Sequence, residues 1–321
     1  MDYMAILRRA ARVTWSYKAL WFFGFLAALF GGGGGWGGWG GGGRGSAPLG
    51  NARAFPGLEI TPGFIAAVVL GVLLLVALAI VLNLVSNAAL IGLVREAEAG
   101  QPVGVRKGFR IGLGRFWALL GIALIVGVPL LLLTVGMVLL GLSPLLLLFA
   151  KAQAAKIVGV IMMVVLMIPI VLIIVALNAV LDLLMEFFRR ACVLEHLGVT
   201  ASLGHGWDVF SGHLKDSIVM AILLFGCSLA FGVLMVPVSL ALIGGPMLVA
   251  LALWAAFHSV ALALGAGLAF GVPAMVLLVF LAGVFKAFTS SVWTLAYLHM
   301  TNHTEPPVGN VPQGVVAEAQ E

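Results

Sequence analysis

The sequence predicts an all-α protein, a polytopic transmembrane helical bundle of about six spans. Three observations lead to this fold class. Hydrophobic residues make up 63% of the chain and charged residues only 9%, against about 25% charged in an ordinary soluble domain. The apolar residues form long runs, and basic residues gather at alternate ends of these runs. A water-soluble fold cannot bury so much apolar surface, so we expect lipid to surround most of the chain.

Residues 1–17 predict an amphipathic helix on the inner membrane surface. Arginines that suit anionic lipid head groups interrupt its apolar residues. These apolar residues are Met4, Ile6, Leu7 and Val13. A cleaved signal peptide is the alternative, because a basic start precedes an apolar stretch. A clear small-x-small cleavage site is lacking, and Trp15 and Trp21 suit an interfacial helix that leads into a retained anchor.

Residues 18–300 predict the transmembrane bundle itself. A bilayer core about 30 Å thick needs ~20 apolar residues per helix. Five runs meet that length, and the shorter run Ala19–Phe30 is a sixth candidate. The five runs are Phe64–Leu84, Phe116–Leu142, Ile157–Leu181, Ile218–Ile243 and Val272–Leu298.

Residues 31–62 predict a glycine-rich external loop. Gly31–Gly45 holds twelve glycines in fifteen residues, a density that gives a mobile chain and no structured motif. A phosphate-cradling loop is the functional alternative, but it needs a strand before it and a helix after it. The sequence predicts neither at this place.

The basic residues predict the orientation of the chain. Twelve of them fall on one side of the predicted spans, the pattern of cytoplasmic loops. They are Arg8, Arg9, Arg12, Lys18, Arg95, Arg106, Lys107, Arg110, Arg115, Arg189, Arg190 and Lys215. We therefore expect a multi-pass protein of the cell's inner (plasma) membrane with a cytoplasmic N-terminus. The basic residues do not form one soluble surface, so no nucleic acid partner is expected.

The stretch 246–271 leaves the number of crossings open. Glycine and proline at Gly244–Pro246 and Gly271–Pro273 predict helix breaks on both sides of it, and His258 interrupts its middle. We favour a re-entrant or interfacial helix pair, which puts the tail in the cytoplasm, whereas a full crossing puts it outside. The tail, 301–321, contains prolines among polar residues and is expected to be disordered.

Two parallel repeat units are predicted, at about 63–142 and 157–243. Each consists of a span, a basic helix end, a glycine-punctuated linker and a second span. Shifts of 95 and 98 residues superpose matching positions. The matched pairs are Asn83 and Asn178, Asn87 and Asp182, Arg95 and Arg190, Gly100 and Gly198, Gly108 and Gly206, Phe109 and Trp207, and Gly114 and Gly212. Duplicated units are frequent in membrane transporters.

Polar residues inside the predicted spans form the candidate site. They recur at i, i+4 spacing, which puts them on one face of each helix. The candidates are Asn83, Asn87, Asn178, Asp182, Glu186 and Lys286. An unpaired charge at membrane depth costs at least ~2.5 kcal/mol, so we expect Lys286 to pair with Asp182 inside a polar cluster. Such a cluster either ties helices together or lines a substrate or ion path.

A repeated His-x-x-Asp in the second linker supplies donors of the type that metals bind. The residues are His205, Asp208, His213 and Asp216. Their spacing fits no standard zinc pattern, so a solvated surface is the favoured reading. No enzyme signature is present either. We therefore expect no catalytic residue, metal or cofactor.

A further pattern resembles a known group of proteins. An aromatic start, Leu20–Leu26, leads to linkers with Gly108-Phe109 and Gly206-Trp207, and the chain closes on the aromatic Trp293–Tyr297. This resembles a broad set of bacterial six-span membrane proteins of unknown function, which are similar to the membrane domain fused to some glycerophosphoryl diester phosphodiesterases. The resemblance implies a compact helical bundle. It implies no activity, because the sequence contains no phosphodiesterase domain, and the long glycine run departs from the pattern.

Two functions follow from these expectations. The leading one is a membrane scaffold or envelope-associated protein, and the alternative is a transporter or permease that uses the polar cluster. A transporter predicts a water-accessible cavity lined by Asn178, Asp182 and Lys286, whereas a scaffold predicts a tightly packed interior. The lipid bilayer is the partner that both functions require.

Overall fold

The computed structural model describes residues 2–31, 62–149 and 153–302, and within these ranges the chain is helical without any strand. The predicted fold class is confirmed. The elements are α1 (Tyr3–Ser16), α2 (Lys18–Phe30), α3 (Pro62–Glu98), α4 (Val105–Leu142), the 3₁₀ helix η1 (Ser143–Phe149), α5 (Gln153–Leu194), α6 (Val199–Gly212), α7 (Leu214–Phe257) and α8 (Val260–Asn302).

In the described ranges, five helices are long and apolar enough to cross a membrane, namely α3, α4 with η1, α5, α7 and α8. The pair α1 and α2, bent by 95° at its junction, is a candidate sixth span. α2 has 13 residues and is about 20 Å long, which is shorter than a hydrocarbon core of about 30 Å. The expected number of about six spans therefore depends on this bent pair.

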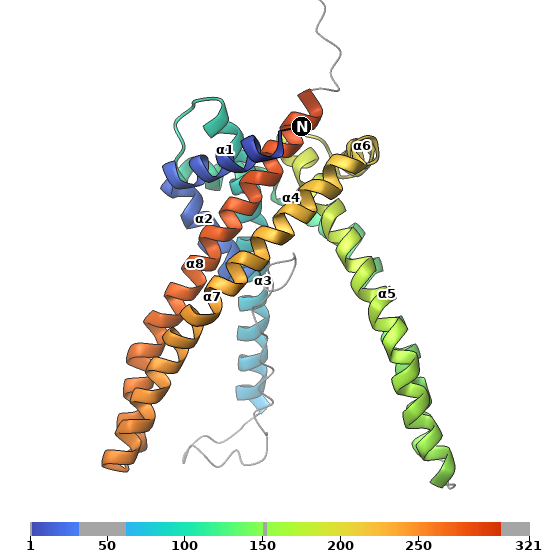
Figure 1. The fold of residues 1–321 in the computed structure, drawn as a ribbon, viewed down its shortest axis with the longest axis vertical. Coiled ribbons are helices and arrows are strands. Elements are labelled where there is room, and N and C mark those ends of the chain that lie inside the picture. Colours follow the sequence, from blue (N-terminus) through green and yellow to red (C-terminus); the bar gives the residue numbers. More distant parts are fainter. Residues whose placement is uncertain (1, 32–61, 150–152, 303–321) are drawn as a thin grey trace, which may run out of the picture.

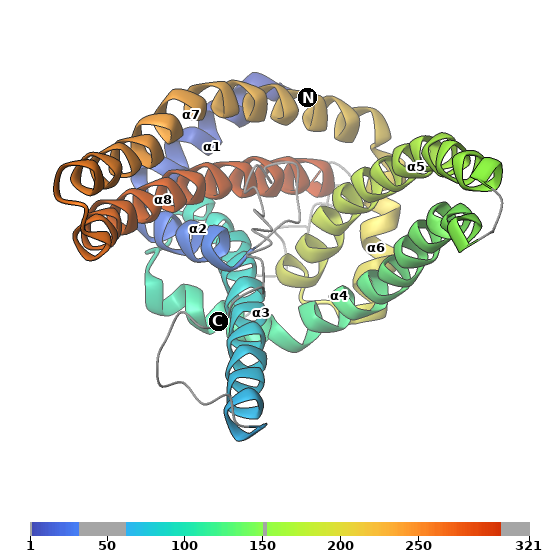
Figure 2. The same cartoon turned by 90° about the horizontal axis from the view of Figure 1, so that it is seen from below.

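The helices converge at one end of the molecule and diverge at the other (Figure 1). We call the converging end, where α1, α2 and α6 lie against the adjoining ends of the long helices, the head. Away from the head, α3, the α4–α5 hairpin and the α7–α8 hairpin separate as three arms, as the view from below shows (Figure 2). The expected compact bundle is thus present only in the head. Lipid tails are as apolar as leucine, so the arms have little to gain by packing together.

The core lies in the head. The main buried stretches begin at Leu84 on α3, at Leu184 on α5 and at Ala287 on α8. Aromatic rings link these helices: Phe187 on α5 lies 5.8 Å from Trp293 on α8, between ring centroids. On the arm side of these positions, apolar side chains are mostly exposed. This boundary divides α3, α5 and α8 into a packed part and a part with exposed apolar side chains.

The α7–α8 hairpin corrects one prediction. α7 continues through Gly244–Pro246 to Phe257, the chain turns at His258 with a φ of 52°, and α8 continues through Pro273. The stretch 246–271 does fold back, but as the tip of two continuous helices, and the expected breaks at its ends were wrong. Proline is tolerated inside membrane helices because neighbouring helices and local adjustments satisfy the backbone groups it frees.

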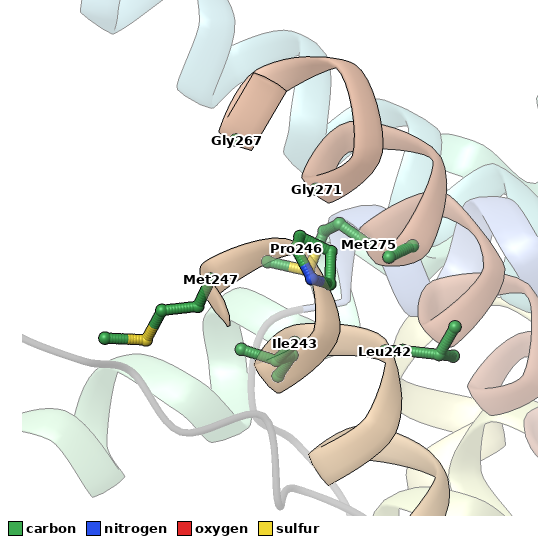
Figure 3. A pocket seen from close by; sticks show the side chains of 8 residues that line it. Leu242, Ile243, Pro246, Met247, Gly267, Gly271 and Met275 are labelled. Carbon is green, nitrogen blue, oxygen red and sulfur yellow. The ribbon is translucent and has the colours of Figure 1, made fainter. Parts of the chain in front are cut away.

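An apolar pocket of about 290 Å³ lies between the two helices of this hairpin (Figure 3). Met247 and Met275 are among the side chains around it, one from each helix. Gly267 and Gly271 of α8 also line the pocket, and they contribute no side chain to fill it. The pocket contains no charged lining residue, which suits an arm surrounded by lipid.

α1 lies across the head and corrects a second prediction. Ile6, Leu7 and Val13, which were expected to contact lipid, pack against the protein core instead. Met4 and Trp15 remain 59% and 73% exposed. An amphipathic pattern predicts that one face is buried, but it does not distinguish a lipid surface from a protein surface.

Polar contacts hold α1 at three places along its length. Tyr3 donates a 2.6 Å hydrogen bond to Asp216 at the start of α7. Arg9 forms an ion pair of 2.5 Å with Glu98 at the end of α3, and Thr14 donates to Ser291 of α8 at 3.2 Å. The helix therefore ties together the head-side ends of three helices, α3, α7 and α8, which belong to two of the arms.

Two predicted segments cannot be compared with the structure. The glycine-rich loop, 31–62, lies outside the described residues except at its two ends. The tail, 301–321, lies outside them beyond residue 302.

Candidate functional site

The predicted polar residues lie at the level where the arms leave the head. Asn83 and Asn87 are beside the start of the buried stretch of α3, Asp182 and Glu186 beside that of α5, and Lys286 beside that of α8. We call this level the base of the arms. All five residues are partly buried, as expected for groups at the edge of a packed core.

A small cavity brings three of the predicted residues together. Asn87, Glu186 and Lys286 line a space of about 20 Å³, which has room for about one water molecule. The other lining residues are Ile91, Arg189, Thr289, Ser290 and Trp293. The site is therefore built from α3, α5 and α8, the three helices that carry the predicted polar residues.

The most buried charge at the base is Arg190, which sequence reasoning had assigned to the cytoplasmic edge. Its side chain is 1% exposed and forms a 2.5 Å ion pair with Glu186 one turn earlier on α5. The guanidinium also donates to the backbone oxygens of Glu186 at 2.6 Å and Ser290 at 3.3 Å. Its Nε has no hydrogen-bond partner. The i, i+4 spacing of Glu186 and Arg190 was the signal that could have revealed the pair.

Lys286 is not paired as expected. Across the described ranges, no carboxylate lies within the 4.0 Å ion-pair distance of its amine, and no hydrogen bond of its side chain is found. The predicted ion pair between Lys286 and Asp182 is thus absent, because Glu186, one turn nearer the head, shares the cavity with the lysine.

The asparagines bond mainly within their own helices. Asn87 donates to the backbone oxygen of Asn83 at 2.8 Å and to its side-chain oxygen at 3.1 Å. Asn178 donates to the Ile174 carbonyl at 2.8 Å and does not line the cavity. The structure therefore divides the six predicted residues: three meet at the cavity, and Asn83, Asn178 and Asp182 lie around it.

The charges at the base do not balance. Arg189, Arg190 and Lys286 are cationic, and Asp182 and Glu186 are anionic. Arg190 neutralises Glu186 in direct contact, whereas Asp182 forms no ion pair within 4.0 Å with either Arg189 or Lys286. Two cations thus face one carboxylate, which makes the base a site with an excess of one cation.

A second polar network lies on the head, beyond the base. Glu195 accepts a 2.5 Å hydrogen bond from Tyr297 and forms a 2.9 Å ion pair with His205. Arg115 bonds the ring of His196. Partial burial and then the nearby cations Arg115 and Arg95 lower the pKa of His196 below its ordinary value.

The residues of the repeated His-x-x-Asp are engaged separately. His205 pairs with Glu195, whereas Asp216 accepts the hydrogen bond of Tyr3. Within the part of the chain that the structure describes, no group of three metal-ligating side chains could hold a metal ion.

A family model matches residues 10–304, from the middle of α1 past the end of α8. The chain belongs to that family, which is described as a family of unknown function (DUF7544). The match includes every residue of the base of the arms. No curated protein and no solved structure matches the chain. Family membership is consistent with the expected uncharacterised membrane protein, and it supplies no activity.

Proposed function

We propose that this protein is a scaffold of the inner (plasma) membrane, with its head and N-terminus on the cytoplasmic side and its arms in the bilayer. The placement rests on charge and length. Apart from Lys156 near the arm-tip start of α5, the basic ends of the described helices are in or near the head, as cytoplasmic segments require. On α3, the exposed apolar part from Phe64 to Asn83 is about 30 Å long at ~1.5 Å per residue, which equals the thickness of a hydrocarbon core.

The observation that carries the proposal is the closed base of the arms. A transporter needs a cavity that admits its substrate, and the charged residues of the base surround a space of only about 20 Å³. The Glu186–Arg190 pair joins α5 to the Ser290 carbonyl of α8. These contacts support a role in fixing helices to one another rather than in passing a solute between them.

The arms supply the surface through which a scaffold works. The most apolar windows of the five long helices are between 0% and 11% buried within the molecule. Lipids and the helices of other membrane proteins therefore have access to most of each arm. We propose no catalytic step. We propose that the membrane domain fused to some glycerophosphoryl diester phosphodiesterases is related to this chain in structure but not in activity.

We also propose that the two units at about 63–142 and 157–243 are related. A Cβ added at Gly108 would lie 2.9 Å from Leu93 Cδ1, and one added at Gly206 would lie 2.6 Å from Phe188 Cδ1. The predicted shift of 98 residues superposes Gly108 on Gly206, and the shift of 95 residues superposes Leu93 on Phe188. Equivalent helix–helix approaches in both units support a parallel repeat.

Cysteine labelling tests the proposed function. Cys192 and Cys227 are first replaced by alanine, and single cysteines are then introduced at exposed Asp208 on the head, at exposed His258 on the arm tip and at Asp182 at the base. In intact cells, an impermeant maleimide is expected to label H258C only. In open membranes it is expected to label D208C as well.

The Asp182 position separates scaffold from transporter. The proposal expects D182C to resist the water-soluble maleimide in intact cells and to react far more slowly than D208C in open membranes, because the base is packed above and bordered by lipid below. Labelling of D182C at the rate of D208C would show a water-filled path and favour the transporter. Labelling of D208C in intact cells would overturn the orientation.

A further inference from the structure

The base of the arms offers two cations that have room for a ligand. Lys286 and Arg189 are both partly exposed, and neither belongs to an ion pair within 4.0 Å in the described ranges. Glu186, the carboxylate nearest to Lys286 in the cavity lining, is already neutralised by Arg190. Asp182 is the other carboxylate of the base and forms no ion pair within 4.0 Å in the described ranges. The two cations outnumber it by one, so a singly charged anion beside them would be attracted.

Hydroxyl and amide groups stand next to these cations. Thr289 and Asn87 line the same cavity and are partly exposed. The cavity itself has room for about one water molecule and not for a phosphate group. A phosphate would consequently lie against the exposed ends of Lys286 and Arg189, with water in the cavity linking it to the head.

The level of the base suits a lipid head group. If the apolar part of α3 fills the hydrocarbon core, Asn83 and Asn87 lie at its inner boundary, where the phosphates of the inner leaflet lie. Directly below, the three arms carry exposed apolar side chains, among them Ile80, Val180 and Leu277. A phospholipid placed there would have its phosphate beside the cations and its acyl chains along the arms.

We propose that the base of the arms binds the phosphate of an anionic phospholipid of the inner leaflet through Lys286 and Arg189. Basic pockets between membrane helices on the cytoplasmic side are suited to such head groups. An anionic lipid such as phosphatidylglycerol fits the excess of one positive charge, whereas the choline of phosphatidylcholine adds a cation next to it. This inference rests on the membrane placement of the proposed function.

Native mass spectrometry of the full chain in detergent, with phosphatidylglycerol added, tests the proposal. The wild-type protein is expected to retain a phosphatidylglycerol molecule in preference to phosphatidylcholine and to diacylglycerol, which has no phosphate. K286Q is expected to weaken this retention about fivefold, since a basic residue near a membrane surface contributes about 1 kcal/mol. K18Q, at an exposed lysine at the start of α2, is the matched control and is expected to retain the lipid as the wild type does.

Several outcomes would overturn the proposal. One is equal retention by K286Q and the wild type, and another is equal retention of phosphatidylcholine. Displacement of the lipid by excess inorganic phosphate would assign the site to the free ion instead. If K286Q fails to fold, as judged by gel filtration and circular dichroism, R189Q provides the same comparison. If the lipid does not bind but the cysteines are labelled as expected, the lipid proposal fails and the scaffold proposal stands. If D208C is labelled in intact cells, the proposed orientation is wrong.

Discussion

The contribution of Arg190 to stability can be worked out from its contacts. The side chain is 1% exposed, its partner Glu186 lies 2.5 Å away, and both are held where α5 meets α8. Removing one member of a buried ion pair costs about 3–5 kcal/mol, because the remaining charge stays desolvated. Lys286 lines the same cavity as Glu186 and compensates for part of the loss. The side chain of Glu186 is also 22% exposed, so the charge left behind is only partly desolvated. We therefore expect R190M to destabilise the head by about 2 kcal/mol, below that range.

The double variant identifies the cause. In E186L/R190M both charges are gone, and apolar side chains fill the space of the pair. Such replacements of buried pairs are often neutral or stabilising, so the double variant is expected to recover most of the stability that R190M loses. R9M is the matched control, because it removes an ion pair of the same 2.5 Å length whose arginine is 64% exposed. Its expected cost is at most about 1 kcal/mol.

The assay is reversible unfolding in mixed micelles of mild detergent and sodium dodecyl sulfate, followed by the fluorescence of the tryptophans. Trp293 lies in the core beside Phe187 and reports on the head. The reasoning is refuted if R190M costs no more than R9M. It is also refuted if E186L/R190M is as unstable as R190M, since the loss would then come from packing and not from an isolated charge.

Two further predictions follow from contacts in the head. First, G108L and G206L are each expected to lower stability by about 1–3 kcal/mol through overpacking, since a Cβ at either glycine meets a neighbouring helix within 3.0 Å. The controls are G114L and G204L, at glycines where an added Cβ meets nothing within 4 Å. Equal losses of stability in both sets would contradict the packing in the head. Second, the hydrogen bond to Asp216, partial burial and the negative charge of Asp216 raise the pKa of Tyr3 above its ordinary value of 10.0. A raised pKa means that folding favours the protonated phenol, so this contribution is complete below pH 10.0 and is lost as the pH rises through the raised value. The difference between the ultraviolet titrations of wild type and Y3F isolates Tyr3 from Tyr17 and Tyr297, and it should show a tyrosine that ionises above pH 10.0. An ordinary titration of Tyr3 would show that α1 is not docked at Asp216.

The sequence predicted the spans well because the length and polarity of a membrane helix follow directly from the bilayer. Hydrophobic runs and i, i+4 spacing are local properties of the sequence. The runs predicted the long helices, and the spacing predicted the polar faces of α3, α5 and α8. The fold-back within 246–271 could also be anticipated, because His258 interrupts the middle of this apolar stretch. The local rules failed at Gly244–Pro246, where the helix continues next to α8.

The partners within the site could not be predicted in the same way. Spacing along a helix places Asp182 and Glu186 on one face, but it does not say which of them lies level with Lys286 on another helix. That depends on how α5 and α8 are shifted along each other where they meet in the head. Arg190 was read as a topological signal because arginines at helix ends usually reach water. Its burial becomes evident only when α8 covers it with Ser290.

The central claim is that the arms leave the polar base into lipid, with no water-filled path between them. A spin label at Asn178, on the arm side of the base, measures this directly through its collisions with oxygen, which concentrates in lipid, and with a water-soluble nickel complex. The account predicts frequent collisions with oxygen and few with nickel in reconstituted bilayers. Frequent collisions with nickel would mean that water enters between the arms, which contradicts the closed base.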